Sequence, residues 1–196
     1  MSRTWALVLA TLWAATSCTV SNPSVVLPPS HSPSAATPIR FFHGKGVSFD
    51  FPASWTPHHF GTSSHFSRSI VDLSNKQPRL GEACPPHDNS KTCWKVVQRL
   101  PPGGALVTWS ANFIPAWTFA EAPGTPTTVG GRKAKVLVEG DKLACVQVRG
   151  DTSVDVVIER PSMPEGWYEM SACLRSPDVA AVESQVRSML RTVTFG

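Results

Sequence analysis

Five cysteines carry the most readily interpreted chemistry in this sequence, and they lie at positions 18, 84, 93, 145 and 173. In an exported protein thiols meet an oxidising compartment and pair, so an odd number leaves one cysteine without a partner. Cys18 is the odd member, because it precedes every segment that could fold. The other four are expected to pair among themselves within a folded domain.

The N-terminus predicts export. Arg3 supplies a positive charge, and an apolar run of eleven residues follows from Trp5 to Ala15. Such a run is too short to cross a bilayer core as a helix, which takes about 20 residues. It has the length of the apolar part of a signal peptide, and small residues follow it directly. We therefore expect residues 1–17 to be a signal peptide outside the folded domain.

The segment Ala15-Thr16-Ser17-Cys18 resembles a bacterial lipobox, in which small residues precede a cysteine that is lipidated. The resemblance implies a lipoprotein whose palmitate-bearing Cys18 anchors it to the extracytoplasmic face of the cell membrane. Ala15 departs from the pattern, which usually has leucine there. The alternative is ordinary cleavage after Ser17 and plain secretion, which would leave an exposed unpaired thiol at the mature terminus. We favour the lipid anchor for that reason.

Two disulfides are predicted among the remaining cysteines. Cys84 and Cys93 flank a hydrophilic loop of eight residues and fit a local bridge. Cys145 and Cys173 could not meet across a simple three-stranded meander, because its outer strands lie about 9.5 Å apart and a disulfide needs Cα atoms within about 7 Å. Either residues 145–151 form a turn or a short helix, or the pairing crosses to the other two cysteines. We favour the first alternative.

Metal and catalytic signals are weak. His58, His59 and His65 are candidates for a metal site, but no carboxylate lies among them and loop histidines more often contact only solvent. The sequence has no G-x-S-x-G, H-E-x-x-H or S-x-x-K motif. We therefore expect no metal, no cofactor and no catalytic residue, and a protein that is more plausibly a binder than an enzyme.

Aromatic residues gather between Trp109 and Phe119, with Phe113 and Trp117 between them. Trp109 and Phe113 share one phase of a predicted strand and are expected in the core. Trp117 and Phe119 follow Pro115 and form the candidate binding surface, because exposed aromatic rings can stack on sugars or contact a partner protein.

Composition and charge describe one globular domain behind a linker. Hydrophobic residues make up 41% of the 196 residues, and the net charge of +4 comes from basic residues spread singly along the chain. That pattern argues against a nucleic-acid partner. Residues 18–38 hold the lipid-anchor cysteine and a linker rich in serine and proline, and residues 39–196 are expected to form the domain.

The domain is predicted to be mainly antiparallel strands. Alternating apolar residues indicate strands at 47–52, 68–74, 94–100, 106–113, 153–160 and 167–174, separated by proline and glycine turns. Gly130-Gly131 lies between β-rich flanks and predicts a hairpin. Ser176, as N-cap, and Pro177 are expected to open a helix, which a short strand at 192–195 follows.

This order of elements resembles the PsbP-like fold, which many secreted actinobacterial lipoproteins share. The resemblance covers about residues 42–195, and its most specific parts are Gly46–Trp55 and Trp167–Asp178 with the following helix. It implies an α+β domain, an antiparallel sheet packed between helices in an α/β/α sandwich. It also implies a non-catalytic envelope protein that binds a protein partner or an envelope component. The alternative is a secreted hydrolase or carbohydrate-binding protein acting on the cell wall.

Overall fold

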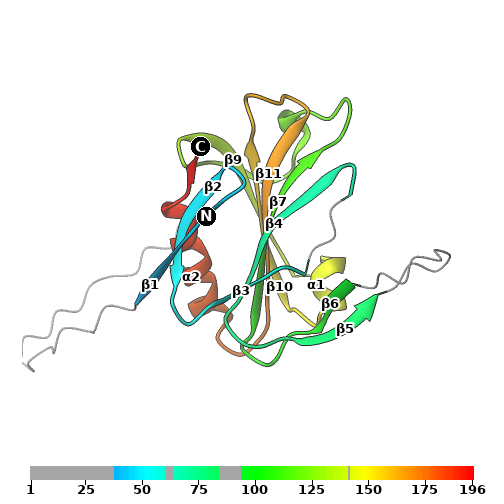
Figure 1. Cartoon of the computed structure of the whole chain (residues 1–196), viewed down its shortest axis with the longest axis vertical. Helices are drawn as coiled ribbons and strands as arrows, with labels where there is room; N and C mark the ends of the chain where they lie inside the picture. Colours follow the sequence, from blue (N-terminus) through cyan, green and yellow to red (C-terminus); the bar gives the residue numbers. More distant parts are fainter. Residues whose placement is uncertain (1–37, 61–63, 84–93, 141) are drawn as a thin grey trace, which may run out of the picture. The chain divides into compact units, whose positions relative to one another are not determined.

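A computed structural model describes residues 38–60, 64–83, 94–140 and 142–196, and it has the predicted α+β character (Figure 1). Its centre is a seven-stranded antiparallel sheet in the order β3-β4-β7-β11-β10-β9-β8. These strands are β3 (Thr56–His58), β4 (Ser67–Ser74), β7 (Ala105–Phe113), β11 (Gly166–Leu174), β10 (Thr152–Glu159), β9 (Arg132–Glu139) and β8 (Thr125–Val129).

Two smaller sheets and three helical segments complete the described residues. The first small sheet has the order β1-β2-β12 and contains β1 (Ile39–Gly44), β2 (Val47–Pro52) and β12 (Thr194–Phe195). The second pairs β5 (Arg79–Ala83) with β6 (Trp94–Arg99). The helices are α1 (Leu143–Gln147), α2 (Val179–Arg191) and a single 3-10 turn at Phe119–Glu121. Of these helices, none is long and apolar enough to cross a membrane.

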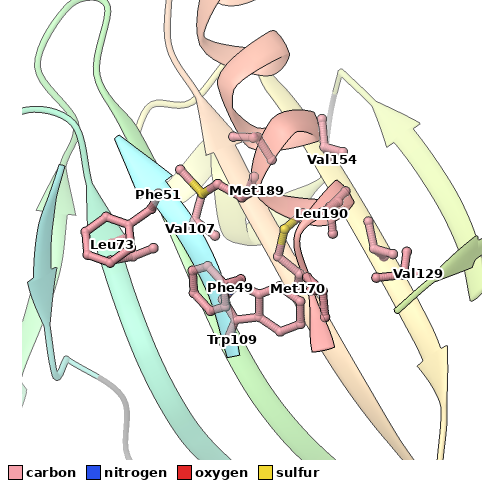
Figure 2. Close-up of a cluster of buried hydrophobic side chains, with 14 of the residues drawn as sticks. Phe49, Phe51, Leu73, Val107, Trp109, Val129, Val154, Met170, Met189 and Leu190 are labelled. Atoms are coloured by element: carbon pink, nitrogen blue, oxygen red, sulfur yellow. The ribbon is translucent and has the colours of Figure 1, made fainter. Parts of the chain in front are cut away.

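One face of the large sheet is the hydrophobic core (Figure 2). Because side chains alternate along a strand, Val107 and Trp109 of β7 point to this face together with Met170 of β11. The ring of Phe49, from β2, stacks on Trp109 with centroids 5.2 Å apart. The predicted burial of Trp109 is confirmed, whereas Phe113, at the end of the same strand, is only half-buried.

Helix α2 packs on the same face as β2. Its residues Val182, Val186, Met189 and Leu190 are buried and recur at helical spacing, as predicted. Its predicted start is wrong, because Ser176 and Pro177 precede the helix instead of capping it. Asp178, the N-cap residue, has a left-handed backbone with φ 74°, so helical geometry begins only at Val179.

The opposite face of the large sheet is lined by polar residues, and we call it the polar face. It carries the alternate side chains of the same strands, including Thr108 and Ser110 of β7 and Glu169 and Ser171 of β11. The resemblance implies a helical layer here. In the part of the chain that the structure describes, the helical segments on that side are only the five-residue α1 and the 3-10 turn, and β6 places Val97 against the buried cluster that contains Cys173 at one end of this face.

The predicted glycine hairpin is confirmed between β8 and β9, where Val129 pairs with Arg132. Both intervening glycines have positive φ, 55° at Gly130 and 77° at Gly131. A Cβ at Gly130 would lie 2.7 Å from the carbonyl oxygen of Val193, whereas a Cβ at Gly131 would meet nothing within 4 Å. Replacing Gly131 therefore measures the free-energy cost of a left-handed backbone alone, and replacing Gly130 adds the cost of a steric clash.

We expect Gly131→Ala to lower the free energy of unfolding by about 1 kcal/mol, the cost of placing an L-residue in the left-handed region. Gly130→Ala should cost at least about 1 kcal/mol more, because the β12 end of the chain must also move away. Urea unfolding of the two variants measures the difference. Equal losses would show that the contact between this hairpin and Val193 is not tight.

Candidate binding groove on the polar face

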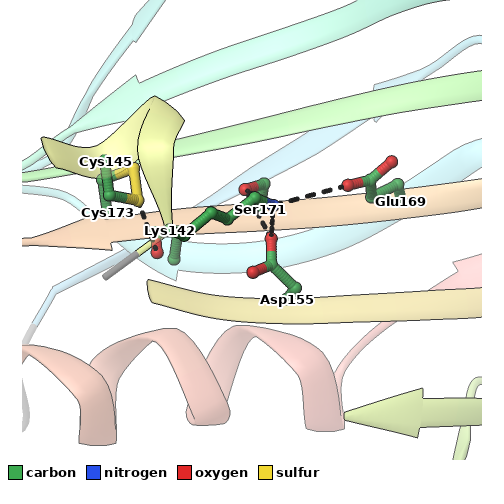
Figure 3. The surroundings of a disulfide bond; sticks show 7 residues. Lys142, Cys145, Asp155, Glu169, Ser171 and Cys173 are labelled. Carbon is green, nitrogen blue, oxygen red and sulfur yellow. Dashed lines mark hydrogen bonds and ion pairs between the residues drawn. A yellow bond between two sulfur atoms is a disulfide. The ribbon is translucent and has the colours of Figure 1, made fainter. Parts of the chain in front are cut away.

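The Cys145–Cys173 disulfide attaches α1 to the polar face (Figure 3). The two Cα atoms lie 5.2 Å apart. The predicted pairing is confirmed, and so is its physical reason, since Cys145 lies in a short helix and not in a third strand of a meander. Cys84, Cys93 and Cys18 lie outside the described residues, so the second disulfide and the lipid anchor stay predictions.

Lys142, directly before α1, reaches over the polar face to two acidic strand residues. Its Nζ donates a hydrogen bond to Asp155 Oδ1 of β10 and another, at 3.3 Å, to Ser171 Oγ of β11. The same nitrogen lies 3.9 Å from Glu169 Oε1. Ser171 Oγ donates to Asp155 Oδ1 at 2.6 Å, so one carboxylate oxygen accepts two bonds (Figure 3).

The second carboxylate oxygen of Asp155, Oδ2, is buried without a hydrogen-bond donor in the described part of the chain. The Asp155 side chain is only 9% exposed. A buried carboxylate oxygen without a donor costs free energy, and such groups mark places where a water molecule or a ligand completes the bonding.

On the same face, hydrogen bonds continue from Glu169 of β11 through β7 to β4. Asn112 of β7 donates its Nδ2 to Glu169 Oε2 at 2.7 Å, and Ser67 of β4 donates its Oγ to Asn112 Oδ1 at 2.7 Å. Together with Lys142 and Asp155 these bonds connect four adjacent strands. The network fixes the side-chain positions of the polar face before any ligand arrives.

Two adjoining cavities lie over this network and form what we call the polar groove. One, of about 330 Å³, is lined by Thr108, Ser110 and Ser171 among others. The other, of about 300 Å³, is lined by residues that include Asp155 and Trp167. Lys142 and Glu169 line both cavities, so the two lie side by side over the sheet.

Trp117 and Trp167 form the aromatic wall of the groove. Their ring centroids are 4.1 Å apart with an interplanar angle of 34°, and both residues line the smaller cavity. Trp117 is half-buried, so the predicted candidate does reach the groove. Phe119, on the 3-10 turn, lines neither cavity; the centroid of its ring lies 5.3 Å from Nζ of Lys135 in β9.

Trp167, Asp155 and Glu169 belong to the groove although no sequence motif singles them out. The signal was present in the alternation of β11, where Trp167, Glu169 and Ser171 share a phase opposite to the apolar residues that enter the core. A tryptophan in the polar phase of a strand points away from the core, so its ring is available to line a binding site.

The histidine loop is not brought together as a metal site. His58 Nε2 lies 2.9 Å from Ser74 Oγ, and its ring stacks on Phe60 at 4.6 Å. Partial burial lowers the pKa of His58 against the opposing attraction of Asp72. His59 and His65 are exposed, and the described residues contain no group of three histidine, cysteine, aspartate or glutamate side chains placed to hold an ion.

The chemistry of the groove is recognition by hydrogen bonding and stacking. Three carboxylates (Glu139, Asp155 and Glu169) and four hydroxyls offer acceptors beside an aromatic wall, and Lys142 is the one cation that lines either cavity in the described part of the chain. A ligand that donates hydrogen bonds and presents a flat or apolar face meets both features. Such a mixture of apolar wall and few fixed polar groups is typical of ligand sites.

Comparison with known proteins assigns no relative to this chain. No protein family, no curated protein and no solved structure matches it. The groove is therefore interpreted from its own residues.

Proposed function

We propose that this protein is a non-catalytic, lipid-anchored protein of the cell envelope whose domain binds an envelope component in the polar groove. The observation that carries the proposal is the buried Asp155 carboxylate, which has an unpartnered oxygen and lines a cavity beside the Trp117–Trp167 pair. Export is supported by the sequence from Arg3 to Ser17 and by the disulfide between Cys145 and Cys173, a bond typical of exported proteins. Anchoring is supported by the lipobox-like segment that ends at Cys18.

A carbohydrate-directed role on the cell wall is the second candidate, favoured by the aromatic pair. Sugar rings present apolar faces that stack on tryptophan and hydroxyls that donate to carboxylates, which is the combination Trp117, Asp155 and Glu169 offer. In a binding protein Glu169→Gln would leave soluble wall fragments intact and weaken their binding. In a hydrolase the wild type would cleave them and the variant would not.

Two measurements test the two halves of the proposal separately. Anchoring is tested by fractionating producing cells. Cys18→Ala should release the protein from membranes or block its maturation, whereas unchanged membrane association would contradict the lipid anchor. The second half concerns binding and does not depend on the anchor.

Binding is tested with cell envelopes and the Cys18→Ala protein, so that no acyl group contributes. We expect saturable binding that Trp117→Ala weakens at least about tenfold, because a tryptophan in a ligand pocket commonly contributes 1–2 kcal/mol or more. Phe41→Ala is the matched control, since Phe41 is an aromatic residue of β1 that is 65% exposed and lines neither cavity. Equal effects of the two substitutions would contradict the groove as the binding site.

A further inference from the structure

Four arginines that are far apart in the sequence lie together at the β5–β6 sheet. They are Arg79, Arg99, Arg149 and Arg175, and each is single in its own stretch of sequence. Arg79 begins β5 and is the register partner of Arg99, which ends β6. The strand pairing therefore brings the first two side chains to the same end of this small sheet.

Hydrogen bonds at Leu100 bring the other two arginines to the same place. The backbone N–H of Leu100, next to Arg99, donates to the carbonyl oxygen of Val148 at 2.9 Å, which places Arg149 alongside. The guanidinium Nη1 of Arg175 donates to the carbonyl oxygen of Leu100. We call these four residues the arginine cluster.

The guanidinium groups are close enough to affect one another. Arg149 and then Arg175 lower the pKa of Arg99, and Arg79 adds to the effect. Such a shift reports that a positive charge is disfavoured at this point by its neighbours. Like charges gathered on a folded surface oppose folding unless a counter-charge arrives.

No carboxylate in the described part of the chain forms an ion pair with any member of the cluster. Asp151 is an acidic residue that interacts electrostatically with the cluster, since Arg175 contributes to lowering the pKa of its carboxyl. That carboxylate already accepts a hydrogen bond from the backbone N–H of Ser176 at 2.7 Å, the main cause of its lowered pKa. Among the described residues, the cluster therefore keeps an excess of positive charge.

The cluster is also held in place and open to a ligand. The Cys145–Cys173 disulfide fixes the two segments that carry Arg149 and Arg175, four and two residues beyond its cysteines. Arg149 has φ 60°, a left-handed conformation that costs a non-glycine residue free energy and that occurs often at binding sites. A cavity of about 330 Å³ lies against Arg79 and Arg99.

We propose that the arginine cluster binds a phosphate-bearing anion. Guanidinium groups match phosphate oxygens through paired charge-assisted hydrogen bonds, and several of them together favour a group with more than one charge or oxygen face. The phosphate could belong to a membrane lipid headgroup or to a free phosphate ion. This site is separate from the polar groove, so the inference does not depend on the function proposed there.

Isothermal titration calorimetry of the full chain with two probes tests the inference. The probes are inorganic phosphate and dihexanoyl phosphatidylglycerol, a lipid used below its micelle-forming concentration. Tighter binding of the lipid would identify a headgroup as the source of the phosphate, and equal or tighter binding of inorganic phosphate would identify the free ion. Either result supports an anion site, provided that it depends on the cluster.

That dependence is measured with Arg79→Gln combined with Arg99→Gln. We expect affinity to fall at least about tenfold, since the two substitutions remove charge-assisted hydrogen bonds to the anion. The matched control combines Arg68→Gln with Arg191→Gln, which removes the same charge from exposed positions outside the cluster. It should bind within about twofold of the wild type. Absence of binding by either probe, or equal losses in the two double variants, would overturn the proposal.

Discussion

Replacing Lys142 by methionine should lower the free energy of unfolding by about 2–3 kcal/mol. Lys142 neutralises Asp155, whose side chain is 9% exposed, and its removal leaves a buried carboxylate without its cation. Breaking one half of a buried ion pair typically costs 3–5 kcal/mol. The expected loss is smaller here because Lys142 itself is 27% exposed and water can reach the remaining charge.

A double-mutant cycle checks the cause of that loss. Asp155→Asn in the Lys142→Met background should recover part of the stability, because it removes the unpaired charge and keeps an acceptor for Ser171. Lys133→Met is the matched control, since that lysine is 77% exposed and its pair with Glu159 should contribute less than about 1 kcal/mol. If both lysine variants unfold at the same urea concentration, Lys142 does not hold the polar groove together.

Loss of the Cys145–Cys173 disulfide should have the larger effect, about 3–4 kcal/mol. The bridge closes a loop with a sequence separation of 28 residues, for which the chain-entropy model gives a value in this range. The Cys145→Ala, Cys173→Ala double variant should therefore unfold at a clearly lower temperature. We expect α1 to be the first element affected, because its five residues are too few to form a stable helix alone.

Reduction of the wild type provides the control for that variant. Reduced wild-type protein and the double variant, also reduced so that the predicted Cys84–Cys93 bridge is open in both, should have the same unfolding midpoint if the Cys145–Cys173 bond, and not the packing of the sulfur atoms, supplies the stability. A variant as stable as the oxidised wild type would show that α1 is held by other contacts. Reduction should also weaken the arginine cluster's binding of phosphate, because the same bond fixes two of its members.

Most of the sheet could be predicted from the sequence because its strands are long and alternate regularly. In β7 the polar residues Thr108 and Ser110 alternate with the core residues Val107 and Trp109. This alternation identifies both faces of the sheet. The pairing of Cys145 with Cys173 followed from pairing Cys84 with Cys93, and the strand spacing then predicted a turn or short helix at residues 145–151, where α1 lies. Short strands such as β3, with only three residues, carry too little pattern to be found in this way.

The functional residues were harder to predict because they meet only through tertiary structure. Lys142, Asp155 and Glu169 come from a loop and two strands, and nothing in their spacing marks them as neighbours. The arginine cluster shows this most clearly. Its four arginines are far apart in the sequence, and strand pairing and hydrogen bonds at Leu100 bring them together. The helix start at Val179 was missed because Ser176 and Pro177 have the residue types of a cap but belong to the turn before it.

We propose the polar groove as the surface with which this protein contacts the envelope. Site-specific photocrosslinking in producing cells tests it most directly, with the crosslinking amino acid placed at Ser110 in the groove or at Ala181 on the exposed side of α2. We predict a discrete crosslinked envelope species from Ser110 that Trp117→Ala removes, and none from Ala181. The same species from Ala181, or none from Ser110, would contradict the groove as the binding surface.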